Sequence, residues 1–420
     1  MFHVTPTRPV GLHFHCLLAL ALLLARPLPA CGQAAGSPLS LEAAIRQALE
    51  RNPEVRAAAR ETDAARARRR QAGALEAPIL TYEAGKLGTS VTREERETSV
   101  RLSQGFPLPP QRSRALELGA AEVAIAEEQQ ESVALRLRGD VTRAYRRLQV
   151  DVLALSTLGE LQNSATDLEE LTGNRLRSGG AGYLDALRAR VERVRLGNEV
   201  IEAERSLQAN RRTLNVLLAR ASDQPIEPSD SLSFVALTDS LPELVASALA
   251  SRPRVRLARL QARREGAALA QAKSLFLPTA EISIGVDRVP GSDTPGVGFG
   301  VSITLPFAPW TDRRARVAEA RALEGSAQAR LETTEREVEA LVRDAYANAR
   351  SAGQLVTRLQ GSLLPDAQDA VHAAVQGYQF GQIDGLALFE TLRTYRSVQL
   401  EYVRSLLNYE LALTDLTTAE

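Results

Sequence analysis

Apolar and polar residues alternate strictly along two stretches of the chain, residues 280–286 and 297–305, separated by a polar loop that contains proline and glycine. A period of two places alternate side chains on opposite faces of a strand, so the stretches predict a β-hairpin with one apolar face and one small or polar face. The apolar positions are Ala280, Ile282, Ile284, Val286, Val297, Phe299, Val301, Ile303 and Leu305. A half-buried sheet of a soluble protein has this pattern, and so does a membrane barrel with lipid outside and water inside.

A second hairpin is predicted earlier in the chain. Leu80 and Tyr82 alternate with polar residues, as do Val100 and Leu102 further along. A charged loop, Lys86–Glu97, lies between them, as Asp287–Gly296 lies within the later hairpin. The strands are expected at about residues 79–85, 98–104, 279–286 and 297–305.

Long helices are predicted around the hairpins. Aromatic residues make up only 4% of the chain, while Ala, Leu, Arg and Glu dominate long stretches, as is typical of extended helices. Pro78 and Pro278 mark helix-to-strand junctions, and Pro107 and Pro306 mark the return, because proline cannot continue a helix. Residues 113–171 contain no proline, and a helix of that span would be about 90 Å long. Residues 312–359 predict a similar helix in the second half.

The chain contains an internal repeat of about half its length. Corresponding residues recur at an offset that grows only from 200 to 202: Pro53 with Pro253, Tyr145 with Tyr346, and Gly179 with Gly381. Such a small drift indicates two structural copies with short insertions. We expect the copies to occupy residues 31–225 and 226–420. Each would contain a short helix, a long helix, a hairpin, a very long helix, a turn and a long returning helix.

The first 30 residues are typical of an export signal. Arg8 provides a positive charge, residues 17–25 form a short apolar run, and small residues follow. The run is too short to span a bilayer as a helix. Cys31 follows a sequence similar to a bacterial lipoprotein cleavage box, so lipidation of Cys31 and ordinary cleavage nearby are both open. Since Cys16 lies inside the signal, no intramolecular disulfide is expected in the mature chain.

The membrane interpretation of the hairpins requires several chains. Helices of the expected length cannot fold back over a hairpin at their end, so both hairpins would lie at one extremity. Four strands cannot close a barrel, since the smallest have about eight, and an open sheet edge is excluded from lipid. The strands would then be shared, with eight in a dimer or twelve in a trimer. A soluble helical bundle explains the helices by themselves but not the hairpins.

Charge and residue content exclude several functions. Basic and acidic residues are equal at 51 each, and no basic stripe with interleaved aromatics occurs, so no nucleic acid partner is expected. Outside the signal the sole histidine is His372, and the one methionine is Met1, so no His, Cys or Met cluster can hold a transition metal. We therefore expect no cofactor, no metal site and no enzymatic activity.

The second turn of the chain reads Tyr378-Gln-Phe-Gly381 and is followed by Leu386 and Leu388, and Gly179 occupies the equivalent turn of the first copy. In these residues the chain resembles the outer membrane efflux protein family, the TolC-like exit ducts. The resemblance covers essentially the whole mature chain and is most specific at this second turn. The region of residues 104–114 resembles the heavy-metal branch of the family.

The family resemblance implies a fold, a location and partners. The expected fold is mainly α with a small membrane β part: a long α-helical barrel and a transmembrane β-barrel shared by a homotrimer, with twelve strands. The barrel would lie in outer membrane lipid and the helices would cross the periplasm. A periplasmic adaptor protein and an inner-membrane pump of the RND type would drive export through this passive duct.

The resemblance also places the candidate site residues. The turns at Gly179 and Gly381, with Tyr378, would form the inner tip where the adaptor docks, although any helical hairpin can use a glycine there. Asp185 and Glu390 match acidic tip and lumen positions, where a ring of carboxylates would favour cations. Solvated carboxylates on a helix face are the alternative. The family's tip arginine falls on Ile383, so a complete Tyr-Asp-Arg set is not expected.

Three functions are compatible with these observations. The first is a passive trimeric exit duct for small molecules or metal ions. The second is a periplasmic helical scaffold or adaptor that never enters the membrane. The third is the exit duct of a type I protein secretion system, which differs from the first only in its pump.

Overall fold

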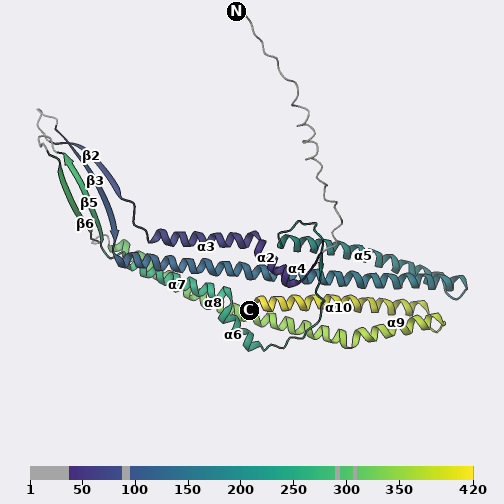
Figure 1. Ribbon diagram of the computed structural model, residues 1–420. Coiled ribbons are helices and arrows are strands. Elements are labelled where there is room, and N and C mark those ends of the chain that lie inside the picture. The colour runs from purple at the N-terminus through teal and green to yellow at the C-terminus, as the bar shows by residue number, and fades with distance from the viewer. Residues whose placement is uncertain (1–36, 88–94, 289–293, 306–309, 420) are drawn as a thin grey trace, which may run out of the picture.

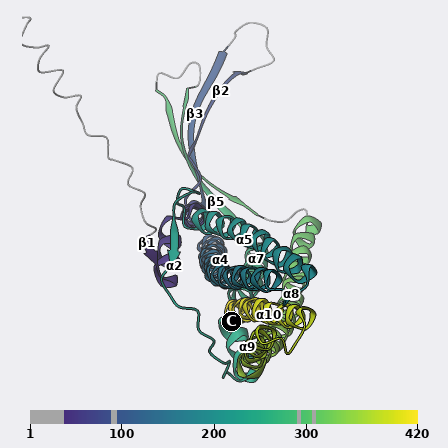
Figure 2. The same ribbon diagram turned by 90° about the vertical axis from the view of Figure 1, so that its right-hand side faces the viewer.

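The computed structural model describes residues 37–87, 95–288, 294–305 and 310–419. Long helices lie side by side along one axis, and a β-sheet projects from one end of this helical body (Figures 1 and 2). The predicted export signal, Cys31, Pro306 and the centres of both hairpin loops lie outside the described residues. No helix in the described ranges is long and apolar enough to cross a bilayer.

The order of elements in the first half recurs in the second. A short helix leads through a joint into a longer helix, a hairpin, a very long helix and a returning helix. In the first half these are α2 (Leu41–Arg51), α3 (Pro53–Ala72), β2 (Ile79–Leu87), β3 (Glu95–Pro107), α4 (Pro109–Arg177) and α5 (Tyr183–Leu217). In the second they are α6 (Leu241–Ser251), α7 (Pro253–Ser274), β5 (Thr279–Arg288), β6 (Gly296–Thr304), α8 (Trp310–Arg358), η1 (Leu359–Leu363), α9 (Leu364–Gln379) and α10 (Gly385–Ala419).

The very long helix differs between the halves. Helix α4 is continuous over 69 residues, whereas in the second half a π-helical turn, η1, separates α8 from α9. Pro365 lies two residues after the end of this turn. Because proline has no backbone N–H to donate four residues back, the regular α-helical hydrogen bonding cannot pass through this point.

The two hairpins form one four-stranded antiparallel sheet in the order β2-β3-β5-β6. The first hairpin joins the second through β3 and β5, and β2 and β6 are the edges. Strands β2 and β3 pair as far as Leu87 and Glu95, so part of the expected loop at residues 86–97 belongs to the ladder. Hydrogen-bond pairing between the two strands therefore extends further than side-chain alternation indicated.

The apolar positions of the four strands lie in register across one face of the sheet. One row is Tyr82, Val100, Val286 and Val297, and the next is Leu80, Leu102, Ile284 and Phe299. All eight side chains are exposed in the single chain, Phe299 to 81%. The sheet thus has a continuous apolar face that none of the described residues covers.

The core of the helical body is built twice at equivalent positions. Ala48 and Val141 are fully buried in the first half, and Ala248 and Val342 in the second. Two short strands that the side-chain pattern did not predict, β1 (Ser37–Leu39) and β4 (Ile226–Pro228), pair in parallel beside the first core. Runs of three residues are too short to show a periodicity.

Candidate functional site

The end of the helical body opposite the sheet contains two turns, between α4 and α5 and between α9 and α10 (Figure 1). We call this end the tip, comprising residues 168–193 and 374–396. The turns are packed together by a shared apolar cluster of Leu168, Ala189, Ala374, Tyr378, Leu388 and Phe389. The candidate residues near the two glycines, 202 positions apart in the chain, therefore belong to one place in the fold.

Both turns have the same backbone geometry. Gly179 and Gly381 have φ of +77° and +73°, in the left-handed region. In each turn the N–H of the following residue donates to the carbonyl five residues back, from Gly180 to Arg175 at 2.8 Å and from Gln382 to Gly377 at 2.7 Å. This pattern caps the end of a helix and requires a residue that tolerates positive φ. A Cβ at Gly179 would meet nothing within 4 Å, so conformation rather than space explains that glycine.

Arg175 connects the two turns. Its guanidinium lies over the Tyr378 ring, 4.5 Å from the centroid, and donates to the Tyr378 carbonyl in the other half of the chain. It also donates to the Gly180 carbonyl at 2.7 Å within its own turn. Sequence reasoning did not identify Arg175, and the available signal was an arginine one helical turn before a capping glycine. The tip therefore has an arginine beside its tyrosine. This arginine comes from α4, whereas the family resemblance placed the tip arginine at position 383, which is isoleucine here.

Asp185 lies against the start of α10. A Cβ at Gly385 would come within 2.3 Å of an Asp185 carboxylate oxygen, so only glycine allows this approach. The side chain of Asp185 is 19% exposed and lies 3.6 Å from Arg188 on the same helix. A carboxylate near a helix N-terminus is favoured by the helix dipole. Gly385 is a second tip residue that sequence reasoning missed.

Tyr378 is buried between these groups, with 2% of its surface exposed. Burial, reinforced by the negative charge of Asp185, raises the pKa of the Tyr378 hydroxyl, while Arg175 opposes the shift. Within the described residues this hydroxyl oxygen is buried without a hydrogen-bond partner. Such a group is costly, which makes the packing around Tyr378 sensitive to rearrangement of the tip.

Glu390 lies on the exposed face of α10. Its carboxylate pairs with Arg393, one turn later, at 3.0 Å, and both side chains are 57% exposed. The structure therefore places Glu390 apart from the Arg175–Tyr378 contact. A neighbouring arginine on the same helix counters part of its charge, which the sequence interpretation of an acidic ring did not consider.

Comparison with known proteins identifies the family. Residues 44–220 and 244–419 each match the sequence profile described as "Outer membrane efflux protein". The cobalt-zinc-cadmium resistance protein CzcC of Cupriavidus metallidurans is 25% identical over 385 residues, which cover 90% of this chain and 88% of CzcC.

Solved structures have the same fold. The transmembrane channel CusC is 20% identical with a TM-score of 0.78, covering 94% of this chain and 97% of its own. The MtrE outer membrane channel of Neisseria gonorrhoeae, solved in its open state, is 20% identical with a TM-score of 0.74, covering 90% and 88%. The duplicated helices, the sheet at one end and the two profile matches agree: this chain is a member of the outer membrane efflux protein family, a channel of the outer membrane that extends into the periplasm.

Proposed function

We propose that the protein is the passive, homotrimeric exit duct of a tripartite efflux system. One observation carries the proposal: a four-stranded sheet with an exposed apolar face and two edge strands, β2 and β6, at one end of a long helical body. An edge strand has backbone N–H and C=O groups that need partners, and lipid provides none. An apolar face of this kind is stable in lipid only if the edges are closed.

Symmetry provides the partners. Strands β2 and β6 run in opposite directions, so β6 of one chain and β2 of the next form an antiparallel pair of the kind already present inside the chain. Three copies related by rotation give twelve strands, an even number within the range of outer membrane barrels. Apolar rows such as Leu80, Leu102, Ile284 and Phe299 then face lipid all round.

The tip is the end that meets the other components. We assign adaptor docking to the turns at Gly179 and Gly381 with Tyr378, and control of the pore to Asp185 and Glu390. A periplasmic adaptor protein and an inner-membrane pump of the RND type complete the system. The cargo is small molecules or metal ions, and the name of the relative CzcC supports metal ions. Lipidation of Cys31 would add an anchor at the outer membrane.

A thiol cross-linking experiment tests the shared barrel. In a Cys31→Ser background, Tyr82→Cys on β2 is combined in turn with Val297→Cys, Phe299→Cys and Val301→Cys on β6, and a short bis-maleimide is added. We expect covalent dimers and trimers and no larger species for at least one pair. The control is Tyr82→Cys with Val100→Cys, which are paired within one chain and should give only monomers. Monomers from every β2–β6 pair, with a reactive control, would exclude the trimer.

A further inference from the structure

The joints between the short and long helices of the two halves are equivalent but chemically different. At the first joint, the Asn52 side chain accepts from the Glu54 N–H at 2.8 Å and donates to the Leu217 carbonyl at 3.1 Å. At the second, Arg252 stands in the same place. Its guanidinium donates to the Thr418 carbonyl at 3.2 Å, but no side chain caps the start of α7. Arginine has donors only, so it cannot replace the acceptor that asparagine provides.

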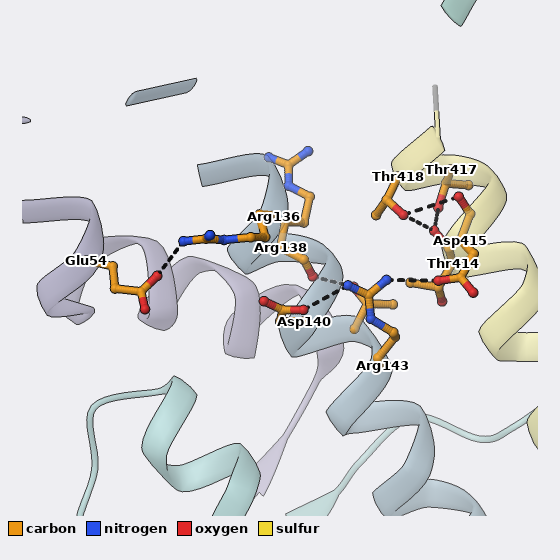
Figure 3. Close-up of polar contacts among 10 residues, drawn as sticks. Glu54, Arg136, Arg138, Asp140, Arg143, Thr414, Asp415, Thr417 and Thr418 are labelled. Carbon is orange, nitrogen blue, oxygen red and sulfur yellow. Dashed lines mark hydrogen bonds and ion pairs between the residues drawn. The ribbon is translucent and has the colours of Figure 1, made fainter. Parts of the chain in front are cut away.

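The next ion pair is reversed between the halves. At the first joint the acidic residue lies in the first turn of α3, where Glu54 pairs with Arg136 of α4 at 2.8 Å (Figure 3). At the second joint a basic residue lies in the first turn of α7, where Arg254 pairs with Glu337 of α8. Two arginines, Arg252 and Arg254, thus lie at the start of α7, where the helix dipole is positive.

A cavity of about 290 Å³ opens at this joint. Its walls come from α4, the start of α7, α8 and the end of α10. The lining residues are Ser132, Leu135, Arg136, Arg143, Arg252, Pro253, Arg254, Leu341 and Thr418. They include four arginines and, among the described residues, no carboxylate.

Only one of the four arginines has no acidic partner in the described residues. Arg136 and Arg254 have the partners given above, and Arg143 lies between Asp140 at 2.8 Å and Asp415 at 2.9 Å (Figure 3). Arg252 is 9% exposed and bonds to a neutral carbonyl. Burial and the nearby charge of Arg254 lower the pKa of Arg252 to about 10, so it stays protonated at neutral pH. A buried cation without a carboxylate is costly unless an anion joins it.

We propose that this cavity is an anion-binding site for a small oxyanion of the phosphate class. The Arg252 guanidinium and the Arg254 N–H, at a helix start that no side chain caps, provide the donors. Arg136, Arg143 and Arg254 line the cavity, but each is already paired with a carboxylate. A bound anion accepts from the start of α7, as the Asn52 side chain accepts from the Glu54 N–H at the start of α3. Because the walls come from both halves of the chain, the anion stabilises the packing of α4, α7 and α10.

Calorimetric titration of the full-length, detergent-purified protein with inorganic phosphate tests the proposal, at constant ionic strength in chloride. We expect saturable binding at one site per chain. Arg252→Asn restores the residue of the first joint and is expected to fold, but to bind phosphate about tenfold or more weakly, because a charge-assisted contact is lost. Arg56→Gln removes an equal charge from an exposed position and should leave binding unchanged.

Three results would overturn the site: no saturable binding to the wild type, equal affinity in Arg252→Asn, or equal weakening by Arg56→Gln. Glu420→Gln tests whether the Glu420 side chain competes with phosphate for the site. If phosphate binds only to the Glu420→Gln variant, that side-chain carboxylate occupies the cavity and the proposal of a free oxyanion is wrong. If the variant and the wild type bind phosphate equally, the free-anion site stands.

Discussion

The Arg175 guanidinium lies 4.5 Å from the centre of the Tyr378 ring, which brings the end of α4 directly against the end of α9. The same guanidinium donates to carbonyls in both turns of the tip, those of Gly180 and Tyr378. One side chain therefore joins the two helical hairpins through residues that are 203 positions apart in the sequence. Any opening of the tip that moves these hairpins apart must break this contact.

Replacing Arg175 with glutamine should weaken the tip. The variant loses a cation–π contact and its charged hydrogen bonds, and we expect the free energy of unfolding to fall by about 1–2 kcal/mol. The open probability in planar bilayers should rise. Arg177→Gln is the matched control, because Arg177 is exposed and its hydrogen bond within the described part of the chain goes to Asn174 on its own helix. Equal effects of the two substitutions would show that Arg175 does not hold the hairpins together.

Gly381→Val tests the tip turn. The φ of +73° lies in a region that costs non-glycine residues about 1–2 kcal/mol, and a β-branched side chain increases the strain. We expect the variant to reach the outer membrane in normal amounts but to lose resistance to exported compounds. Gly325→Val, on an exposed helix face with no atom near the added Cβ, should retain resistance. Normal resistance in Gly381→Val would remove this turn from the docking site.

The Glu390–Arg393 ion pair on α10 predicts opposite changes in ion selectivity when either residue is replaced. If Glu390 faces the pore, Glu390→Gln should lower the preference for cations, because three carboxylates are lost per trimer. Arg393→Gln should raise that preference, because it removes the positive partner 3.0 Å away. Reversal potentials in a salt gradient measure both effects. Unchanged potentials in both variants would place Glu390 on a solvated face outside the pore.

The contact between α4 and α5 predicts a pH effect on stability. Burial raises the pKa of Asp151 above 3.8, although Asn210 at 2.5 Å and Ser206 at 3.3 Å donate to its carboxylate. A raised pKa means that the folded state holds the proton more tightly, so the stability from this group is complete below pH 3.8 and is lost as the pH rises.

Asp151→Asn should therefore gain stability relative to the wild type as the pH rises above about 4, since the amide does not ionise. Thermal unfolding in detergent at a series of pH values measures this difference. Asp63→Asn, an exposed residue on α3, is the control and should not show a comparable trend. A difference between Asp151→Asn and wild type that stays constant with pH would contradict the assignment.

Much of the architecture followed from local patterns. Alternation from Ala280 to Val286 predicted a strand, and Pro78 and Pro278 predicted the ends of helices, because both signals act on adjacent residues. The family resemblance likewise placed Gly179 and Gly381 at turns, which the positive φ values explain. The pairing of β3 with β5, which merges the two hairpins, is a contact between the halves that neither stretch encodes alone.

The missed residues depend on contacts between distant segments. Arg175 resembles any helical arginine until Tyr378 packs beneath it, and Gly385 resembles a flexible residue until Asp185 lies against it. In the same way, the sequence around Arg252 is typical of a charged surface residue. In the structure Arg252 is buried at the second joint, in the position equivalent to Asn52 at the first. Burial of a charged side chain is a tertiary property, so periodicity alone could not reveal it.

Single-channel recording of the full-length protein in a planar lipid bilayer tests the central claim most directly. We predict discrete, long-lived openings, which Phe299→Asp on the apolar face should abolish by placing a charge against lipid. Ser302→Asp, on the opposite face of the same strand, should retain them. A protein that stays in solution without conducting, or equal conductance in both variants, would contradict a shared membrane barrel.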